Sequence, residues 1–306
     1  MEKNNLVLMT GITGHSGQFA IERLAQRREE LGEMRFRAMV RPTSDISRIR
    51  ASGLPIELFI GDLLDDACLK KALQDVDTLL HIVGIMESPR VLRFAAEAGV
   101  KRAILVHTTG IYSKYKVASS DYLAVDAEVT KLAADQQIDL TILRPTMIYG
   151  GMDDQNVIKF IRMVDRLPII PVVSGARFVL QPVHRRDLGY AYTDVLLAPG
   201  TTSGKCYVLS GKAPIQLRDM LCILAEYLEK PAIFFSVPYW IAITGAWALF
   251  LMSFTKVDYR EKVQRLVEPR AYSHDDAARD FGYTPVDFAT GVKDEVVAYR
   301  ASKKQF

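Results

Sequence analysis

A glycine-rich turn near the N-terminus, Thr10-Gly11-Ile12-Thr13-Gly14-His15-Ser16-Gly17, constrains the fold of this chain more than any other segment. The apolar run at residues 6–9 precedes it, and apolar residues at helical spacing follow it between residues 16 and 30. A short apolar strand that enters a helix through such a turn is typical of the first unit of an open parallel α/β sheet.

Each glycine of the turn has its own physical role. Gly11 permits the tight exit from the strand, Gly14 lets phosphates approach the backbone, and Gly17 lets the helix pack close to the sheet. The start of the helix offers unpaired N–H groups and the positive end of its dipole to an anion. The turn therefore predicts a site for the pyrophosphate of a dinucleotide. Its predicted contacts are Gly11, Thr13, Gly14, His15, Ser16 and Gly17.

Strands and helices alternate over the first half of the chain. Apolar runs predict further strands at residues 36–40, 56–60, 78–83, 103–106 and 140–143, and helical spacing predicts helices at 67–73, 91–98 and 121–134. Parallel neighbours need crossovers, and these supply the covering helices. We predict an α/β fold, a Rossmann-type doubly wound parallel sheet, in residues 1–150. Prolines punctuate the following stretch, which predicts a smaller substrate-binding region, residues 151–306, interleaved with the sheet.

Composition excludes several classes of protein. The formal net charge is +3 at pH 7, so we predict no nucleic-acid partner. Cys68, Cys206 and Cys222 are far apart, and the histidines lack HxxxH or HxH spacing, so we predict neither a disulfide framework nor a metal site. The apolar run before Gly11 is too short for the core of a signal peptide. We therefore expect a cytoplasmic protein.

One long segment, residues 231–255, contains no charged residue. Its length would suffice to span a bilayer, but Pro238 interrupts it. Two interpretations stay open. The segment forms a buried or substrate-covering helix, or residues 232–254 make peripheral membrane contact, with Trp240 and Trp247 as interfacial aromatics. In the second case the protein would be membrane-associated.

Five segments in order along the chain carry a family resemblance. They are the glycine-rich turn, Gly61-Asp62-Leu63, the LRPTMIYG of residues 143–150, the PVHRRDL of residues 182–188 and the FGYTP of residues 281–285. Together they resemble the short-chain dehydrogenase/reductase superfamily, in its extended and atypical branches. These branches include NAD-dependent epimerases and dehydratases and NmrA-like NAD(P)-binding proteins. The resemblance covers nearly the whole chain and implies an NAD(P)-binding domain.

The resemblance also implies where the rest of the dinucleotide lies. Asp62 would contact the adenine after the third strand. Further cofactor contacts are predicted at Leu63, Val83, Gly84 and Pro145.

The end of the second strand bears on the choice between NAD and NADP. An NAD site generally places Asp or Glu there to accept from the ribose 2′-hydroxyl, but residues 38–42 contain no carboxylate and carry Arg41 instead. Arginine can pair bidentately with a 2′-phosphate, so NADP(H) is favoured over NAD(H). The alternative is that Arg41 stacks on the adenine of either cofactor.

The resemblance implies a proton relay made of a Tyr, a Lys four residues later, and a Ser or Thr after the fifth strand. Thr108 matches the Ser/Thr position, and Tyr112 with Lys116 forms a literal YxxxK. Tyr122 is the other candidate, but Asp126 occupies the position expected for its Lys, and a carboxylate there disfavours the phenolate. Either Tyr112 and Lys116 have taken over proton transfer, or the chain has lost it.

These features predict an NADP(H)-binding oxidoreductase or epimerase. Its small-molecule substrate would carry a carbonyl or secondary alcohol and be nucleotide-sugar-like or hydrophobic. The alternative is a catalytically altered NADP(H)-binding redox sensor or structural subunit, which Asp126 in the Lys position supports. The sequence leaves the substrate, the reaction direction and the oligomeric state open.

Overall fold

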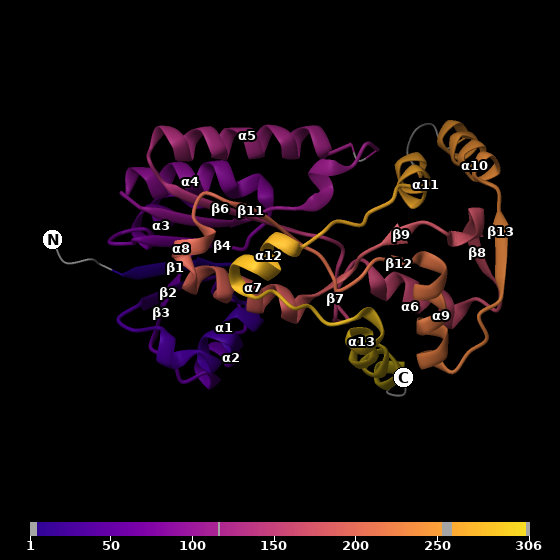
Figure 1. Cartoon of the computed structure of the whole chain (residues 1–306), viewed down its shortest axis with the longest axis horizontal. Helices are drawn as coiled ribbons and strands as arrows, with labels where there is room; N and C mark the ends of the chain where they lie inside the picture. The colour runs from indigo at the N-terminus through magenta and orange to yellow at the C-terminus, as the bar shows by residue number, and fades with distance from the viewer. Residues whose placement is uncertain (1–4, 116, 253–258, 304–306) are drawn as a thin grey trace.

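A seven-stranded parallel sheet with its covering helices forms the larger part of the molecule (Figure 1). The structure is a computed structural model and describes residues 5–115, 117–252 and 259–303. The strand order is β11-β6-β5-β4-β1-β2-β3, with β1 at the point where the order reverses. The strands are β1 (Leu6–Thr10), β2 (Arg35–Val40), β3 (Ile56–Ile60), β4 (Thr78–His81), β5 (Arg102–Val106), β6 (Asp139–Pro145) and β11 (Cys206–Leu209). The order and the parallel pairing confirm the predicted Rossmann-type sheet.

Helices cover both faces of this sheet (Figure 1), and each face of the sheet has its own hydrophobic core. One face carries α1 (Gly17–Gln26), α2 (Ser47–Ala51) and α7 (Arg185–Leu197). The other carries α3 (Asp66–Ala72), α4 (Ser88–Glu97) and α5 (Ser119–Asp135). The six strands expected from apolar runs are all present, because a run of apolar residues is a strong local signal for a strand.

The seventh strand comes from the C-terminal half of the chain. Strand β11 pairs with β6, Cys206 opposite Ile142, and so extends the sheet at its edge. The C-terminal half therefore contributes to the sheet, while the boundary drawn at residue 150 stays a prediction.

A third hydrophobic core lies beyond the carboxyl ends of the strands. It is enclosed by α6 (Val157–Arg166), α9 (Leu217–Leu228), α13 (Phe288–Lys303) and β8 (Ile170–Val173). Short strand pairs join this region: β7 (Ile148–Tyr149) with β10 (Val183–His184), β9 (Val179–Leu180) with β12 (Ile215–Gln216), and β8 with β13 (Phe234–Val237). The remaining α-helices are α8 (Pro199–Thr202), α10 (Tyr239–Met252), α11 (Arg260–Leu266) and α12 (Asp275–Phe281), and 3₁₀ turns lie at η1 (Arg28–Glu30), η2 (Ile85–Glu87), η3 (Thr109–Tyr112) and η4 (Ser174–Ala176).

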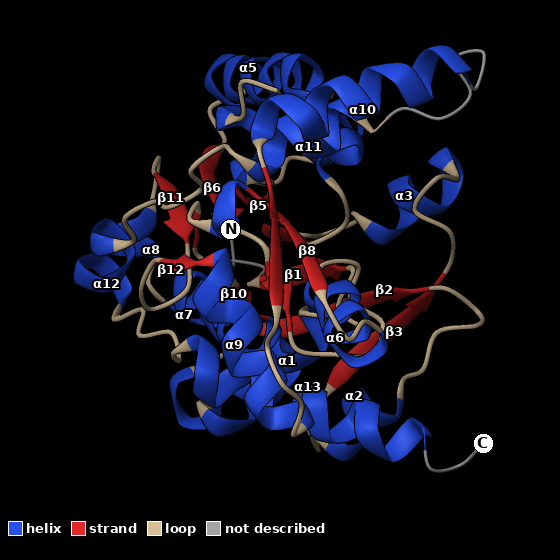
Figure 2. Ribbon diagram, turned by 90° about the vertical axis from the view of Figure 1, so that its right-hand side faces the viewer, coloured by secondary structure: helices blue, strands red, loops and turns tan. Residues whose placement is uncertain are grey.

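The uncharged segment forms β13 and then α10, separated by Pro238. The expectation of a buried helix is wrong, because Ala246 is the one buried residue of α10. Helix α10 lies at the outer end of the molecule, beside the short α11 (Figure 2), and most of its side chains are exposed among the described residues. No helix among the described residues combines the length and the apolar character needed to cross a bilayer.

A buried carboxyl group joins α13 to the end of β7. Glu295 is 2% exposed, and its Oε2 accepts a hydrogen bond from the Gly150 N–H at 2.9 Å. Burial, together with the neighbouring Asp154 carboxyl, raises the pKa of Glu295 to about 9. Glu295 is therefore protonated at neutral pH and can donate to Asp154.

Replacing Glu295 with Gln tests this assignment. The unfolded chain ionises Glu295 near its ordinary pKa of 4.5, while the folded protein keeps it neutral up to about 9, so this group destabilises the fold progressively as the pH rises between those values. Glu295→Gln removes the ionisation, and we expect a gain in unfolding free energy of about 2 kcal/mol near neutral pH or above, vanishing under acid conditions. Urea unfolding across pH measures it. The exposed Glu226→Gln is the control, and parallel pH profiles for the parent and Glu295→Gln would contradict the assignment.

Candidate functional site

The turn between β1 and α1 is packed tightly on one side and open on the other. Gly11 has a φ of +76°, and a Cβ there would lie 3.1 Å from the backbone nitrogen of Val83. A Cβ on Gly17 would collide with the Gly11 carbonyl oxygen, so only glycine allows α1 to start this close to the turn. A Cβ on Gly14 would meet only that same oxygen, at 3.1 Å, and its outer side is open. The open side is where the sequence predicts a pyrophosphate.

A cavity of about 440 Å³ lies against this turn. One wall is the turn itself together with the residues after β4, and the other wall comes from β7, from the loop that follows it and from the start of α7. The lining residues are Gly11, Gly14, His15, Ser16, Gly17, Ile82, Val83, Ile148, Tyr149, Asp153, Asp154, Gln155, Asn156 and Arg185. The cavity thus lies at the carboxyl ends of β1 and β4, at the reversal of strand order, where open α/β sheets bind ligands.

Asp153 connects the two walls of this cavity. Its carboxylate lies 2.6 Å from Nδ1 of His15 and 3.4 Å from a terminal nitrogen of Arg185. The Nε of Arg185 is buried with no hydrogen-bond partner among the described residues. A cationic side chain beside the open face of Gly14 is suited to an anionic ligand.

The other residues predicted to bind the cofactor lie along the same edge of the sheet. Arg41 follows β2 and is exposed, and the side chain of Asp62, after β3, accepts from the Leu64 N–H at 2.9 Å. The carbonyl of Pro145, at the end of β6, accepts from the Thr109 hydroxyl at 3.1 Å. Thr13, Arg41, Asp62, Leu63, Gly84 and Pro145 do not line the 440 Å³ cavity. Their roles stay predictions.

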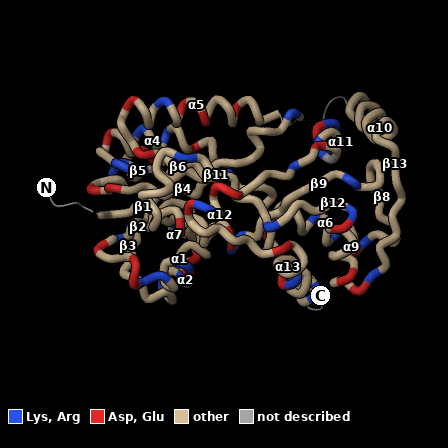
Figure 3. The backbone as a smooth tube through the Cα atoms, in the orientation of Figure 1, with Lys and Arg blue, Asp and Glu red and all other residues tan. Residues whose placement is uncertain are grey.

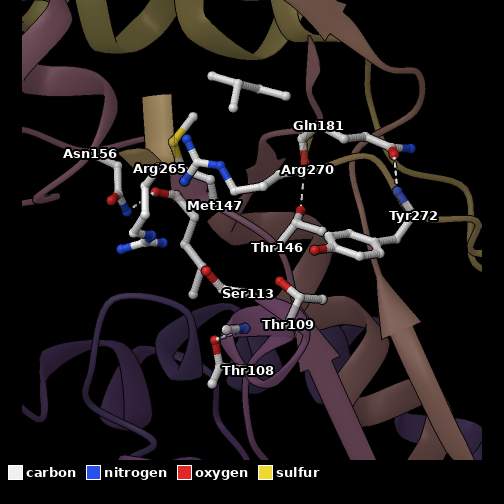
Figure 4. A pocket seen from close by; sticks show the side chains of 13 residues that line it. Thr108, Thr109, Ser113, Thr146, Met147, Asn156, Gln181, Arg265, Arg270 and Tyr272 are labelled. Carbon is white, nitrogen blue, oxygen red and sulfur yellow. Dashed lines mark hydrogen bonds between the residues drawn. The ribbon is translucent and has the colours of Figure 1, made fainter. Parts of the chain in front are cut away.

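A second cavity, of about 310 Å³, lies beyond the ends of β5 and β6 (Figure 4). Its lining comes from the turn after β5, the segment after β6 and the segment around α11. The residues are Thr108, Thr109, Gly110, Ser113, Thr146, Met147, Ile148, Asn156, Leu180, Gln181, Arg265, Arg270 and Tyr272. Thr108 caps η3 by accepting from the Gly110 N–H at 3.0 Å, which fixes its side chain at this cavity. Ile148 and Asn156 line both cavities, so the two adjoin.

Two arginines line the second cavity together. The Nε atoms of Arg265 and Arg270 are buried and have no hydrogen-bond partner among the described residues. Burial, and then the charge of Arg265, lower the pKa of Arg270. Glu268 lies between them in the chain, but its carboxylate accepts from the Ser113 hydroxyl and the Lys114 N–H, both at 2.7 Å. Arg265 also lies 3.6 Å from Glu261, so what suits the cavity to an anionic group is the pair of unpartnered Nε–H donors.

The predicted proton relay has an arginine at its centre. Arg144, from β6, donates to the Tyr112 hydroxyl at 2.9 Å and to Asp126 at 2.6 Å. His107 lies 2.9 Å from the other oxygen of Asp126. Burial opposes the charged form of Asp126, but the hydrogen bond from His107 and the charge of Arg144 outweigh it and lower its pKa. The residue in the Lys position is thus an ionised carboxylate that holds Arg144 against Tyr112.

The remaining relay residues are placed differently. Lys116 lies outside the described residues. Tyr122 lies in the first turn of α5, one turn before Asp126, and is half-buried against the core under that helix. Sequence reasoning missed Arg144, which it treated as part of the LRP motif. A signal was available in the sequence: Arg144 directly follows the predicted strand 140–143, and Asp126 occupies the helix position where the resemblance expects a lysine.

Removing the charge of Asp126 tests this cluster. Asp126→Asn leaves Arg144 without its anion, and we expect a loss of about 2 kcal/mol in the free energy of unfolding. Asp135→Asn, an exposed position at the end of the same helix, should change stability by less than about 0.5 kcal/mol. Urea unfolding measures both. Equal effects of the two substitutions would show that the partly buried pair of Arg144 and Asp126 contributes nothing to the free energy of unfolding.

The parallel sheet and the cavity at its glycine-rich turn define the class of a dinucleotide-binding α/β protein. A family model described as NAD(P)H-binding matches residues 11–168, just over half of the chain. The chain belongs to this NAD(P)H-binding family.

Two curated relatives match about half of the chain. Sterol demethylase protein B of Methylococcus capsulatus is 26% identical over 178 residues, which is 48% of this chain and 52% of the relative. The 2-alkyl-3-oxoalkanoate reductase of Stenotrophomonas maltophilia is 29% identical over 168 residues, 52% of this chain and 51% of the relative. The chain spans about half the length of these two relatives.

Solved structures are similar over nearly the whole chain. Gox2253 has a TM-score of 0.77 at 21% identity and covers 97% of this chain and 98% of its own. The UDP-glucuronic acid 4-epimerase of Bacillus cereus, in complex with NAD, has a TM-score of 0.71 at 15% identity, and the match covers 97% of this chain and 99% of that one. The triphenylmethane reductase of Citrobacter sp., complexed with NADP(H), has a TM-score of 0.71 at 19% identity, and the match covers 94% of this chain and 99% of that one. These likenesses confirm the fold, and the family match confirms the NAD(P)H-binding domain that the resemblance implies.

Proposed function

We propose that this protein is an NADP(H)-dependent oxidoreductase or epimerase acting on a carbonyl or secondary alcohol. The observation that carries the proposal is the junction of the two cavities at Ile148 and Asn156. A dinucleotide whose pyrophosphate lies at Gly14 would extend toward that junction, and a substrate in the second cavity would meet its reactive end. When bound, the nicotinamide supplies the hydride.

Residues in and beside the second cavity would orient the substrate and move a proton, since the ring of Tyr112 lies 5.4 Å from that of Tyr272, which lines the cavity. Thr108 would hold the reacting oxygen. The Tyr112 hydroxyl would exchange a proton with it, because Arg144 donates to the phenol oxygen and leaves the phenol hydrogen free to be given away. Arg144 would be the cation beside the phenol oxygen, a place that the sequence assigned to Lys116. Tyr122 is the alternative proton donor.

The substrate would carry an anionic group near its carbonyl. Arg265 and Arg270 favour a carboxylate or phosphate, and Tyr272 adds an aromatic surface. A nucleotide-sugar-like molecule carries phosphates, and a hydrophobic substrate meets this requirement where it carries a carboxylate, as an oxoacid does. The name of one relative, 2-alkyl-3-oxoalkanoate reductase, describes a substrate of the second kind.

Asp126 in the Lys position favours the alternative of an NADP(H)-binding redox sensor or structural subunit. Hydride transfer separates the two functions. We expect NADPH to be oxidised in the presence of some member of a panel of carbonyl compounds with carboxylate or phosphate groups. Tight NADPH binding with no turnover on any member would favour the sensor.

Gly14→Val tests the dinucleotide site. A Cβ at Gly14 would meet little of the protein, so the fold should survive, but the side chain would fill the space proposed for the pyrophosphate. We expect NADPH affinity to fall by about a hundredfold or more. Isothermal calorimetry measures binding, and circular dichroism checks the fold. Gly200→Val, where a Cβ would meet nothing within 4 Å, is the control. Unchanged affinity in Gly14→Val would remove the basis of the proposed function.

Arg41→Asp tests the choice between NADP and NAD. A guanidinium that pairs with a 2′-phosphate contributes a charge-assisted contact, and an aspartate would repel the phosphate and accept from a 2′-hydroxyl instead. We expect the ratio of NADPH to NADH affinity to fall by about tenfold or more. Arg93→Asp, on the exposed surface of α4, makes the same charge change as a control. An unchanged ratio of the two affinities would mean that Arg41 does not contact the 2′ position of the adenosine ribose.

A further inference from the structure

The outer end of the molecule carries an extended apolar surface. We call it the apolar tip and define it as α10 together with Leu167, Ile169, Ile233 and Phe235. These four side chains are exposed on or beside the paired strands β8 and β13, and α10 follows β13 directly. No Lys, Arg, Asp or Glu lies on α10 or β13 (Figure 3). Monomeric proteins rarely expose a contiguous apolar surface of this kind without a binding role.

The distribution of side chains around α10 decides what can cover the apolar tip. Its exposed large side chains are Trp240, Ile241, Trp247, Leu249, Leu251 and Met252. At 3.6 residues per turn these are spread over about 200° of the circumference. A helix that docks on one protein face needs an apolar stripe of only about 100° and keeps its other face polar. Hydrocarbon, which can contact a helix from several sides at once, fits α10 better than a single protein face.

The polar groups of the helix are also suited to an apolar medium. The hydroxyl of Thr244 donates to the Trp240 carbonyl at 2.7 Å, so it brings no unsatisfied donor into lipid. The helix has 14 residues and is about 21 Å long, shorter than the roughly 30 Å of a bilayer's hydrocarbon core. It can therefore lie in the interface between headgroups and acyl chains, but it cannot span.

Cations border the apolar tip. The guanidinium of Arg260 lies over the rings of Trp247 and Phe250, at 4.2 and 3.7 Å from their centres. Arg218 lies in the same way over Phe234, at 4.5 Å. Cations at the edge of an apolar surface with tryptophans are typical of elements that bind anionic headgroups while their apolar side chains enter the lipid.

We propose that the apolar tip binds the surface of a membrane that contains anionic phospholipids, with α10 inserted at the level of the headgroups. The proposal is independent of the proposed chemistry, because none of the residues that define the apolar tip lines either cavity.

The two tryptophans of the chain, Trp240 and Trp247, both lie in α10, so tryptophan emission reports on the apolar tip alone. With vesicles of equal parts phosphatidylcholine and phosphatidylglycerol, we expect the full chain to float with the lipid. We also expect its emission to shift to shorter wavelength and to be quenched by brominated acyl chains. Emission that is neither shifted nor quenched would overturn the proposal.

A double substitution removes two large, exposed side chains of the apolar tip. Trp240→Ser with Leu251→Ser changes side chains that are 66% and 65% exposed, so we expect the fold to be kept and vesicle partitioning to fall by about tenfold or more. Ile60→Ser with Leu64→Ser is the matched control, since these side chains, on the distant edge of the sheet, are 65% and 64% exposed. Equal losses in both pairs would overturn the proposal.

Self-association is the competing use of the apolar tip. Light scattering without lipid would show it as a dimer that the Trp240→Ser and Leu251→Ser pair converts to a monomer. Such a dimer, together with no flotation of the parent protein, would overturn the proposal. If the double variant fails to fold, the quenching of the parent protein's tryptophans by brominated lipid still decides the question.

Discussion

The close approach of α1 to its neighbours is the constraint on which the rest of the structure depends. At its start, Gly17 lies against the carbonyl oxygen of Gly11. On its flank, a Cβ on Gly189 of α7 would come within 2.5 Å of both Phe19 Cβ and the Ser16 carbonyl oxygen. With α1 fixed from both directions, the turn is pressed against Val83, and one face of Gly14 stays open to the cavity. The space for a dinucleotide is therefore a consequence of backbone packing.

The charges of the second cavity depend on contacts between distant parts of the chain. Arg144 and Asp126 form a partly buried pair whose charges compensate each other, and the pair presents a cation to Tyr112. Arg265 lies 3.6 Å from Glu261, and the charge of Glu268 acts on Arg270, but the buried Nε atoms of both arginines have no hydrogen-bond partner among the described residues. A buried donor without a partner is costly, and a ligand that accepts from it recovers that cost. This supports the proposal of an anionic substrate.

Helix α11 links the apolar tip to the second cavity. Arg260, at its start, lies over the aromatic rings of α10, and Arg265, one turn and a half later, lines the cavity. A protein that holds α10 at a membrane surface would therefore bring this cavity close to the lipid.

The sequence by itself determined the strands from β1 to β6, helices α1, α3, α4 and α5, and the glycine-rich turn that is predicted to bind a pyrophosphate. These follow from apolar runs and glycines that act over a few residues, and such signals are readable without knowing what packs where. Only the tertiary structure decided that β11 joins β6, that Arg144 pairs with Asp126, that Arg265 faces Arg270 and that α10 is exposed. Each of these depends on which surfaces meet across long stretches of chain, and an isolated segment carries the same apolar or charged residues whichever partner it finds.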